Sequence, residues 1–170
     1  KHLLVTNDYP PKVGGIQNYL WELWRRLPAD KVTVLTPSHP DAESFDTAQE
    51  HRVVRDKRKV FLPTRQLASR IRDLADEVDA ELVVLDPALP LGHLGLALGL
   101  PYAIVAHGAE ITVPGRLPGA RFLLSRVLRG AEFVVSAGGY PAQEASRAAG
   151  RQLKTIEIPP GVDQNKFEPR

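Results

Sequence analysis

The sequence predicts an α/β fold of the Rossmann-like, doubly wound type, with a mainly parallel sheet and helices on both faces. Three observations support this prediction. Short apolar runs alternate with amphipathic segments along the whole chain. Most of these runs are continuous, as in strands that are buried on both faces of a parallel sheet. The first run leads through a glycine-containing loop directly into a helical pattern, which is the layout of a strand–helix unit.

Each expected strand is a run of mainly apolar residues, and each expected helix has apolar residues three or four positions apart. The region 37–65 has the least regular pattern, and we expect an extended or flexible insertion there. The expected strands are Leu3–Thr6, Val32–Thr36, Arg52–Arg55, Leu82–Leu85, Tyr102–Ala106, Phe133–Ser136 and Thr155–Ile158, and the expected helices are 16–27, 66–78, 88–98, 118–129 and 140–149.

Composition limits the classes of function. The 170 residues, 43% hydrophobic and 25% charged, are typical of one globular domain or of one lobe of a larger protein. No apolar run approaches the ~18 residues of a membrane span, and we see no signal peptide. The chain has no Cys, which excludes disulfides, thiol catalysis and thiolate metal sites and fits a reducing compartment. We therefore expect a cytoplasmic protein.

The two ends of the chain predict that it is part of a longer protein. The chain contains no Met and begins at Lys1, already inside the pattern of the first strand. The segment 159–170 opens with two prolines and a glycine, as a linker does. We therefore expect 1–158 to form one lobe, 159–170 to begin an interdomain linker, and the second lobe to be absent from this chain.

The loop after the first strand is the first candidate site. Gly14 and Gly15 lie directly before the helix expected over 16–27. Glycine lets the backbone turn sharply and approach a phosphate closely, and the free N–H groups of a helix start bind anions. The alternative is an ordinary strand-to-helix turn with glycines for close packing. A Gly-Gly pair alone does not decide between the two.

A second candidate site follows the strand Tyr102–Ala106. Right-handed crossovers place the loops after all parallel strands at one edge of the sheet, so His107 is expected beside the glycine loop. A histidine there is able to hydrogen-bond a sugar hydroxyl or a phosphate near neutral pH. Glu110 either orients a polyhydroxyl ligand or caps the next helix. The alternative is purely structural, a His107 bonded to a neighbouring carbonyl. The remaining histidines have no metal-ligand spacing, so we predict no protein-bound metal.

A basic stretch covers residues 52–72, where eight Lys or Arg accompany one acid, Asp56, in a chain of net charge +2. Such a stretch attracts anionic lipid headgroups, and Phe61, Leu62 and Leu67 are expected to reach into the interface. No aromatic stacking pattern accompanies the charge, so we expect no nucleic acid. The alternative is a solvated face. The residues assigned to an acceptor or membrane surface are Lys57, Arg58, Lys59 and Arg65.

Three motifs occur in order and together span the chain. They are Asn7-Asp8-Tyr9-Pro10-Pro11 with Gly14-Gly15-Ile16-Gln17, then His107-Gly108-x-Glu110, then Pro159-Pro160-Gly161-Val162-Asp163 with Phe167. This combination resembles the amino-terminal lobe of retaining GT-B glycosyltransferases of family 4. The resemblance is strongest to the phosphatidylinositol mannoside mannosyltransferases of actinobacteria.

The resemblance implies two Rossmann-like lobes, with the reaction in the cleft between them. The lobe described by this chain mainly binds acceptor, and a carboxy-terminal lobe holds most of the nucleotide sugar. The implied catalytic residues are His107 and Glu110, with His107 near the anomeric centre of the transferred sugar. Asp8 and Tyr9 are assigned to the acceptor side. The residues implied to meet the donor phosphates are Gly14, Gly15, Ile16 and Gln17.

We therefore expect the full-length protein to transfer mannose from GDP-mannose to a phosphatidylinositol-type glycolipid or similar acceptor, without a cofactor or metal. It is expected to contact the anionic inner face of the plasma membrane peripherally, and the single lobe is expected to be inactive. Two alternatives remain open. One is a glycosyltransferase of the same fold that uses another nucleotide sugar and a soluble or polysaccharide acceptor. The other is a non-catalytic module that binds a nucleotide or an anionic membrane.

Overall fold

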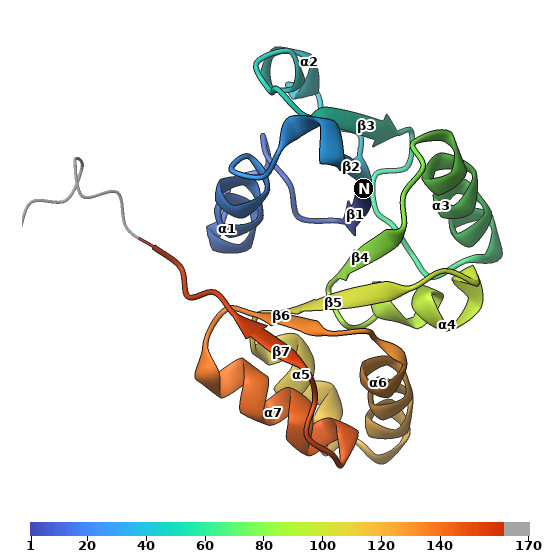
Figure 1. Cartoon of the computed structure of the whole chain (residues 1–170), viewed down its shortest axis with the longest axis vertical. Helices are drawn as coiled ribbons and strands as arrows, with labels where there is room; N and C mark the ends of the chain where they lie inside the picture. The colour runs from blue at the N-terminus through green and yellow to red at the C-terminus, as the bar shows by residue number, and fades with distance from the viewer. Residues whose placement is uncertain (162–170) are drawn as a thin grey trace, which may run out of the picture.

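The computed structural model describes residues 1–161, and seven parallel strands form one sheet in it (Figure 1). Their order is β3-β2-β1-β4-β5-β6-β7, so the chain starts in the middle, runs to one edge, and returns to build the other half. This order confirms the predicted Rossmann-like sheet. The strands are β1 His2–Thr6, β2 Val32–Pro37, β3 Arg52–Asp56, β4 Leu82–Asp86, β5 Tyr102–Ala106, β6 Val134–Ser136 and β7 Thr155–Glu157.

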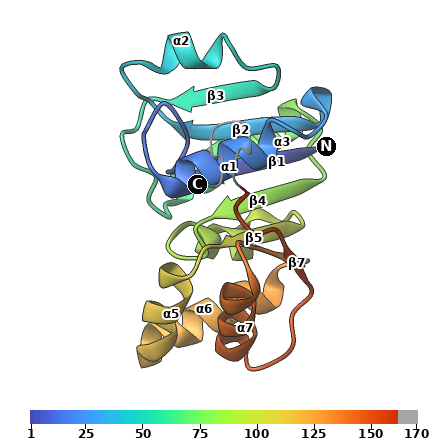
Figure 2. The ribbon, with the colours of Figure 1, turned by 90° about the vertical axis from the view of Figure 1, so that its left-hand side faces the viewer.

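Helices lie on both faces of the sheet, as predicted, but unequally. In Figure 1, α1 lies on one side of the sheet, and α3 and α4 lie on the other. Figure 2 shows α5, α6 and α7 grouped beside the second half of the sheet. The α-helices are α1 Gly15–Trp24, α2 Ala42–Asp46, α3 Arg65–Glu77, α4 Gly95–Leu98, α5 Ala109–Arg116, α6 Pro118–Gly130 and α7 Gly139–Ala149, and the 3₁₀ helices are η1 Ala29–Lys31 and η2 Leu91–Leu94.

The central strands are buried on both faces. Along β1, Leu3 and Val5 belong to the larger of two apolar clusters, whereas Leu4 belongs to the smaller one beneath α1. This alternation follows from the two-residue period of a strand, and it explains why the predicted strands read as continuous apolar runs. The sheet therefore has little freedom to shift its register, and the strand ends that carry polar residues are held in place.

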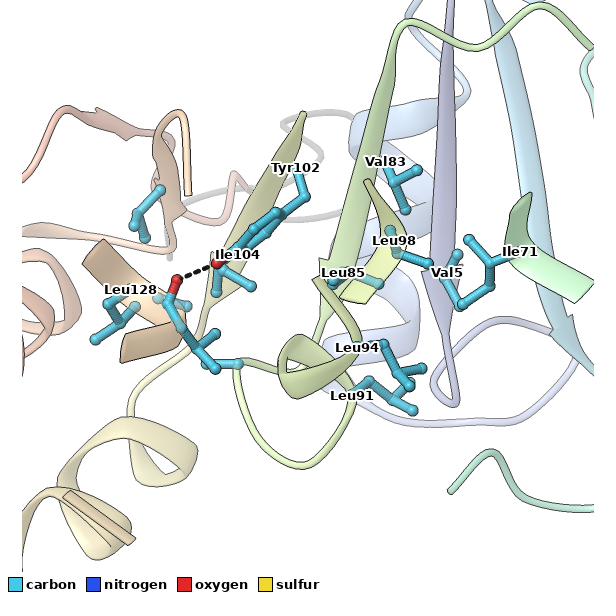
Figure 3. Packing of buried hydrophobic residues seen from close by; sticks show 14 of the residues in the cluster. Val5, Ile71, Val83, Leu85, Leu91, Leu94, Leu98, Tyr102, Ile104 and Leu128 are labelled. Atoms are coloured by element: carbon cyan, nitrogen blue, oxygen red, sulfur yellow. Dashed lines mark hydrogen bonds between the residues drawn. The ribbon is translucent and has the colours of Figure 1, made fainter. Parts of the chain in front are cut away.

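The larger cluster also fixes the second half of the sheet (Figure 3). Leu85 of β4 and Ile104 of β5 pack there with Leu91 and Leu94 of η2. The hydroxyl of Tyr102 is buried in the cluster and donates a hydrogen bond of 2.7 Å to the carbonyl of Val127, drawn as a dashed line in Figure 3. A buried hydroxyl needs such a partner, so this bond ties α6 to the start of β5.

Several predicted helices differ from the structure. The helix expected over 16–27 ends at Trp24, and Ile16 and Leu27, expected on its buried face, are both 37% exposed. The helix expected over 88–98 is instead the 3₁₀ turn η2 followed by the short α4. The helix α5, which contains Pro114, is absent from the expected helix ranges, although Glu110 was considered as the cap of a helix there.

The region 37–65 is more ordered than expected. Besides the edge strand β3, which was predicted over Arg52–Arg55, it contains the unexpected helix α2. Phe45 of α2 packs edge-on against Trp21 of α1, and the indole N–H of Trp21 donates to Oε1 of Gln49 at 2.8 Å. Trp21 is thus held by this region. The predicted linker over 159–170 lies largely outside the described residues.

The strand order reverses between β1 and β4. From β1 the chain builds one half of the sheet, and from β4 it builds the other half. At such a switch point the neighbouring loops diverge at the carboxyl edge and leave room for a ligand. Thr6, at the end of β1, pairs in register with Asp86, at the end of β4. The switch point therefore carries two adjacent polar side chains.

Candidate functional site

Three polar side chains meet at the switch point, each from the carboxyl end of a different strand. The hydroxyl of Thr6 donates to Oδ2 of Asp86 at 2.6 Å, and Nε2 of His107, directly after β5, lies 2.7 Å from Oδ1 of the same carboxylate. Asp86 is fully buried, whereas 10% of the His107 side chain remains exposed. The cluster of Thr6, Asp86 and His107, here called the switch-point cluster, therefore reaches the surface through His107.

His107 was predicted at this edge, whereas Asp86 was not. The signal was present, because Asp86 directly follows the apolar run Leu82–Leu85 and so stands at the carboxyl end of a buried strand. An acid at that position is unusual in a core and needs a partner. Its partners, however, come from two other strands, 80 and 21 residues away in the sequence.

Two further contacts hold His107. Its backbone N–H donates to Oε1 of Glu110 at 2.5 Å, and the ring of Tyr19 from α1 packs edge-on, with the ring centres 5.5 Å apart. The carboxylate of Glu110 also accepts from the N–H of Gly108 at 3.0 Å. Of the two roles considered for Glu110, the structure shows the helix cap: its carboxylate occupies the N-terminus of α5.

Electrostatics favour a retained proton in the cluster. Burial alone lowers the pKa of His107, but the hydrogen bond and charge of Asp86, with the charges of Glu110 and Asp8, raise that pKa above its ordinary value. Burial raises the pKa of Asp86, and the hydrogen bond and charge of His107 offset part of this effect. Since the two groups are coupled, they keep one shared proton to a higher pH than an exposed histidine does.

The glycine loop is attached to the same cluster. The hydroxyl of Thr6 accepts a hydrogen bond of 2.8 Å from the N–H of Asp8. The carboxylate of Asp8 accepts from Nε2 of Gln17 at 2.6 Å and from Nζ of Lys12 at 2.7 Å. Gln17 is buried, so its side chain stabilises the loop and is not open to a ligand. Asp8 likewise serves as an anchor of this loop.

The N-terminus of α1 is the open part of this loop. Gly14 precedes the helix, Gly15 begins it, and both are exposed. Among residues 1–161, no side chain accepts a hydrogen bond from the first N–H groups of α1, whereas Glu110 accepts from the N–H groups of His107 and Gly108 just before α5. Its first N–H groups are therefore available to an anion, and the helix dipole favours negative charge there.

Tyr9 does not lie on the surface, contrary to its assignment to an acceptor or membrane face. Its side chain is 1% exposed, and its hydroxyl lies 2.8 Å from Nε2 of His51. The aromatic ring packs edge-on against Phe45 of α2. The unexpected α2 covers Tyr9, which is the physical reason for the difference.

The basic stretch is partly neutralised by ion pairs. Arg55 pairs with Asp46 at 2.7 Å, and two further pairs join Arg58 to Asp56 and Arg52 to Glu77. Within the described residues, no ion pair involves Lys57, Lys59, Arg65 or Arg70. An open pocket of about 510 Å³ lies here, apart from the switch-point cluster, and its lining residues are Arg55, Asp56, Lys57, Arg58 and Arg70.

The apolar residues of this stretch differ from the expectation. Phe61 and Leu67 are fully buried in the larger cluster, so neither reaches an interface. Leu62 is 59% exposed and does remain at the surface. The backbone N–H of Phe61 donates to Oδ1 of Asn7 at 2.7 Å, which ties the basic stretch to the loop after β1.

Residues 1–161 contain neither a metal-binding cluster nor a membrane-spanning helix. No group of three or more His, Asp or Glu side chains is arranged to hold a metal ion in this part of the chain. None of the helices over the same residues is both long and apolar enough to cross a bilayer.

Sequence relatives of known activity match nearly the whole chain. A GDP-mannose-dependent α-(1-6)-phosphatidylinositol monomannoside mannosyltransferase of Mycobacterium tuberculosis is 37% identical over 98% of this chain. A mannosyltransferase of Corynebacterium glutamicum that acts on the monoacylated monomannoside is 30% identical over 99% of it. In both cases the chain spans 46% of the relative, which is about half the relative's length.

Solved structures and a family profile agree with the fold. HepE of Anabaena, solved in complex with UDP, superposes on 97% of this chain with a TM-score of 0.70 and 18% identity. A sucrose-phosphate synthase of Thermosynechococcus elongatus superposes on 99% of it with a TM-score of 0.69 and 16% identity. The chain covers 45% and 50% of these two proteins. The profile of Glycosyltransferase Family 4 matches residues 13–166, and the chain therefore belongs to that family.

Proposed function

We propose that this chain is the acceptor-side, amino-terminal lobe of a retaining mannosyltransferase, which transfers mannose from GDP-mannose to a phosphatidylinositol-type glycolipid. The observation that carries the proposal is the similarity to GDP-mannose-dependent phosphatidylinositol monomannoside mannosyltransferases over 98% of the chain. The switch-point cluster supports it, because the partly exposed His107 and the open start of α1 lie at the edge where this fold binds ligands.

In this proposal the start of α1 and His107 bind different parts of the donor. The N–H groups at the start of α1 bind the diphosphate of the donor, whose negative charge grows as the bond to mannose breaks. His107 contacts the transferred sugar near its anomeric carbon. A second lobe supplies most of the contacts to the nucleotide, so the lobe described here does not turn over alone. Protein positive charge and helix dipole act in place of a metal ion.

The test is sugar transfer by the full-length protein. We expect radiolabel from GDP-mannose to move into the lipid phase when phosphatidylinositol-containing vesicles are present. Label that stays on GDP-mannose while another nucleotide sugar is consumed would leave a glycosyltransferase but contradict the mannose donor. Transfer to a soluble glycan in place of the lipid would contradict the acceptor. No transfer from any donor would leave a non-catalytic binding lobe.

We further propose that the basic stretch meets an anionic membrane surface peripherally. Lys57 and Lys59 are exposed and have no ion pair in the described structure, and Leu62 adds an exposed apolar side chain between them and Arg65. Lys or Arg close to an anionic bilayer contributes roughly 1 kcal/mol each, and the attraction weakens with salt. This arrangement would hold the cleft beside the lipid acceptor at the inner face of the plasma membrane.

Replacing Lys57, Arg58 and Lys59 together by Gln is expected to weaken binding to anionic vesicles by about tenfold to a hundredfold at low salt, since three cations are lost. Arg58 is expected to contribute less to this loss than the two lysines, because it is paired with Asp56. Cosedimentation with phosphatidylinositol-containing vesicles measures the effect. The matched control replaces three cations of α6, Arg121, Arg126 and Arg129. An equal loss in both triple variants would indicate that net charge, and not this surface, determines binding.

A further inference from the structure

Three contacts hold His107 and leave one ring atom free. Asp86 binds Nε2, Glu110 accepts from the backbone N–H, and Tyr19 packs against the ring. Within residues 1–161 no hydrogen bond involves Nδ1 of His107. If Nε2 carries its proton toward the carboxylate, Nδ1 is the ring atom that a substrate oxygen is able to use.

Asp86 itself has no access to a substrate. It is completely buried, and its two carboxylate oxygens are engaged by Thr6 and His107. Removing a carboxylate from water is costly, and a buried ion pair is weak evidence for stability, since apolar replacements are often equally stable. The contribution of Asp86 to folding stability therefore does not explain why an acid is buried at the carboxyl end of β4.

We propose that Asp86 is a positioning residue, which fixes the ring orientation of His107 and keeps a proton on its Nε2, so that Nδ1 is presented to the transferred sugar. This inference rests on the function proposed above and names the group that orients its sugar-contacting histidine. The register pairing of Thr6 with Asp86 makes the arrangement rigid, because both residues end central parallel strands.

The charge of the pair suits the reaction. Departure of the diphosphate leaves positive charge on the sugar, and an unpaired imidazolium would repel it. The Asp86 carboxylate balances the protonated ring, so the pair is neutral overall while Nδ1–H still donates to a sugar oxygen. The other ionisable groups that face His107 are Asp8 from the loop after β1, Glu110 from α5 and Tyr19 from α1. Both carboxylates favour the protonated ring.

The variant Asp86→Asn tests the inference in the full-length protein. The amide keeps the size of the side chain but no longer dictates which ring nitrogen carries the proton. We expect kcat for transfer from GDP-mannose to fall by about tenfold to a hundredfold, the range found when a group that orients a metal-bound histidine is lost. The KM for GDP-mannose should change little, because Asp86 does not touch the donor.

The pH profile of kcat separates positioning from a structural effect. Without the carboxylate the pKa of His107 falls, because burial of the ring then has less to oppose it. The limb of the profile that reports loss of the His107 proton is expected to move to lower pH in Asp86→Asn. Asp76→Asn, which removes an exposed acid of α3, is the control and should keep the wild-type profile.

A double-mutant cycle completes the test. In a His107→Gln background, Asp86→Asn should add almost no further loss of kcat, because there is no imidazole left to orient. Two losses that multiply, or an Asp86→Asn enzyme with wild-type kcat and pH profile, would overturn the inference. If the wild type uses a nucleotide sugar other than GDP-mannose, the donor proposed above is contradicted. The double-mutant cycle is then run with that sugar, and its result still decides the role of Asp86.

Discussion

Replacing His107 by Ala in the full-length protein is expected to lower kcat for sugar transfer by about a hundredfold or more. Loss of one positioned transition-state contact has this magnitude in other enzymes. The exposed tenth of the His107 side chain is the point at which the switch-point cluster reaches the surface. Initial rates with radiolabelled GDP-mannose measure the effect. His93→Ala is the matched control, because His93 is exposed on η2, and a near-wild-type rate for His107→Ala would remove His107 from the site.

The same variant should change how stability depends on pH. In the folded state, burial raises the pKa of Asp86 above its ordinary value of 3.8. A group with a raised folded-state pKa loses stabilisation as pH rises, because the folded state then has to give up a proton that it holds more tightly. In the wild type His107 offsets this loss. Without it, the melting temperature of His107→Ala should fall further below wild type at about pH 6.5 than at about pH 5, a range in which the raised pKa of His107 keeps the folded wild-type ring protonated.

His107→Gln distinguishes lost chemistry from lost stability. The Gln amide is able to donate to Asp86, so the buried carboxylate keeps a partner and the fold loses less than with Ala. We expect its melting temperature to stay near wild type while its kcat falls as in His107→Ala. Recovery of wild-type kcat in His107→Gln would mean that any hydrogen-bond donor suffices at this position.

The sheet was predictable from the sequence because burial on both faces produces a strong local signal. The runs that became β1, β4 and β5 are continuous and apolar, and each begins and ends within a residue of its prediction. Their order along the chain, with helices between, limits the topology to few arrangements. The shared edge of the loops after β1 and β5 followed from this topology alone, and it placed the glycine loop and His107 together.

What was missed depends on contacts between segments far apart in the sequence. Tyr9 carries a polar hydroxyl and follows Asp8 in a loop, yet α2 and His51 bury its side chain. Phe61 belongs to the basic stretch, between Lys59 and Arg65 in the sequence, yet it packs in the larger cluster. The position of Asp86 after an apolar run is visible in the sequence, but its partners Thr6 and His107 are not. No local pattern encodes these three environments, because each is created by side chains from other elements.

The predicted helix boundaries were wrong for a related reason. The apolar spacing that predicted a helix to residue 27 includes Ile16, which lies in the exposed first turn of α1, and Leu27, which lies beyond the end of α1 at Trp24. Pro114 is normally a helix breaker, but α5 tolerates it near its end. Tertiary packing thus decided where these helices begin and end, and local propensity did not.

The second prediction with a large effect concerns the donor. Replacing Gly15 by Leu in the full-length protein is expected to abolish transfer from GDP-mannose while the lobe stays folded. A Cβ at Gly15 meets no atom within 4 Å, so the fold tolerates the side chain. The Leu side chain would, however, occupy the space over the first N–H groups of α1, where the diphosphate is proposed to bind. Transfer rates and calorimetric binding of GDP-mannose measure the effect.

The choice of glycine decides how this result is interpreted. At Gly14 a Cβ would lie 2.1 Å from Oε1 of Gln17, and the Gln17–Asp8 bond that holds the loop would be disturbed. A loss at that position would mix folding with binding. Gly119 of α6 also has open space around a Cβ, so Gly119→Leu controls for the added apolar side chain. If Gly15→Leu keeps its melting temperature and also its transfer rate, the diphosphate does not bind at the start of α1.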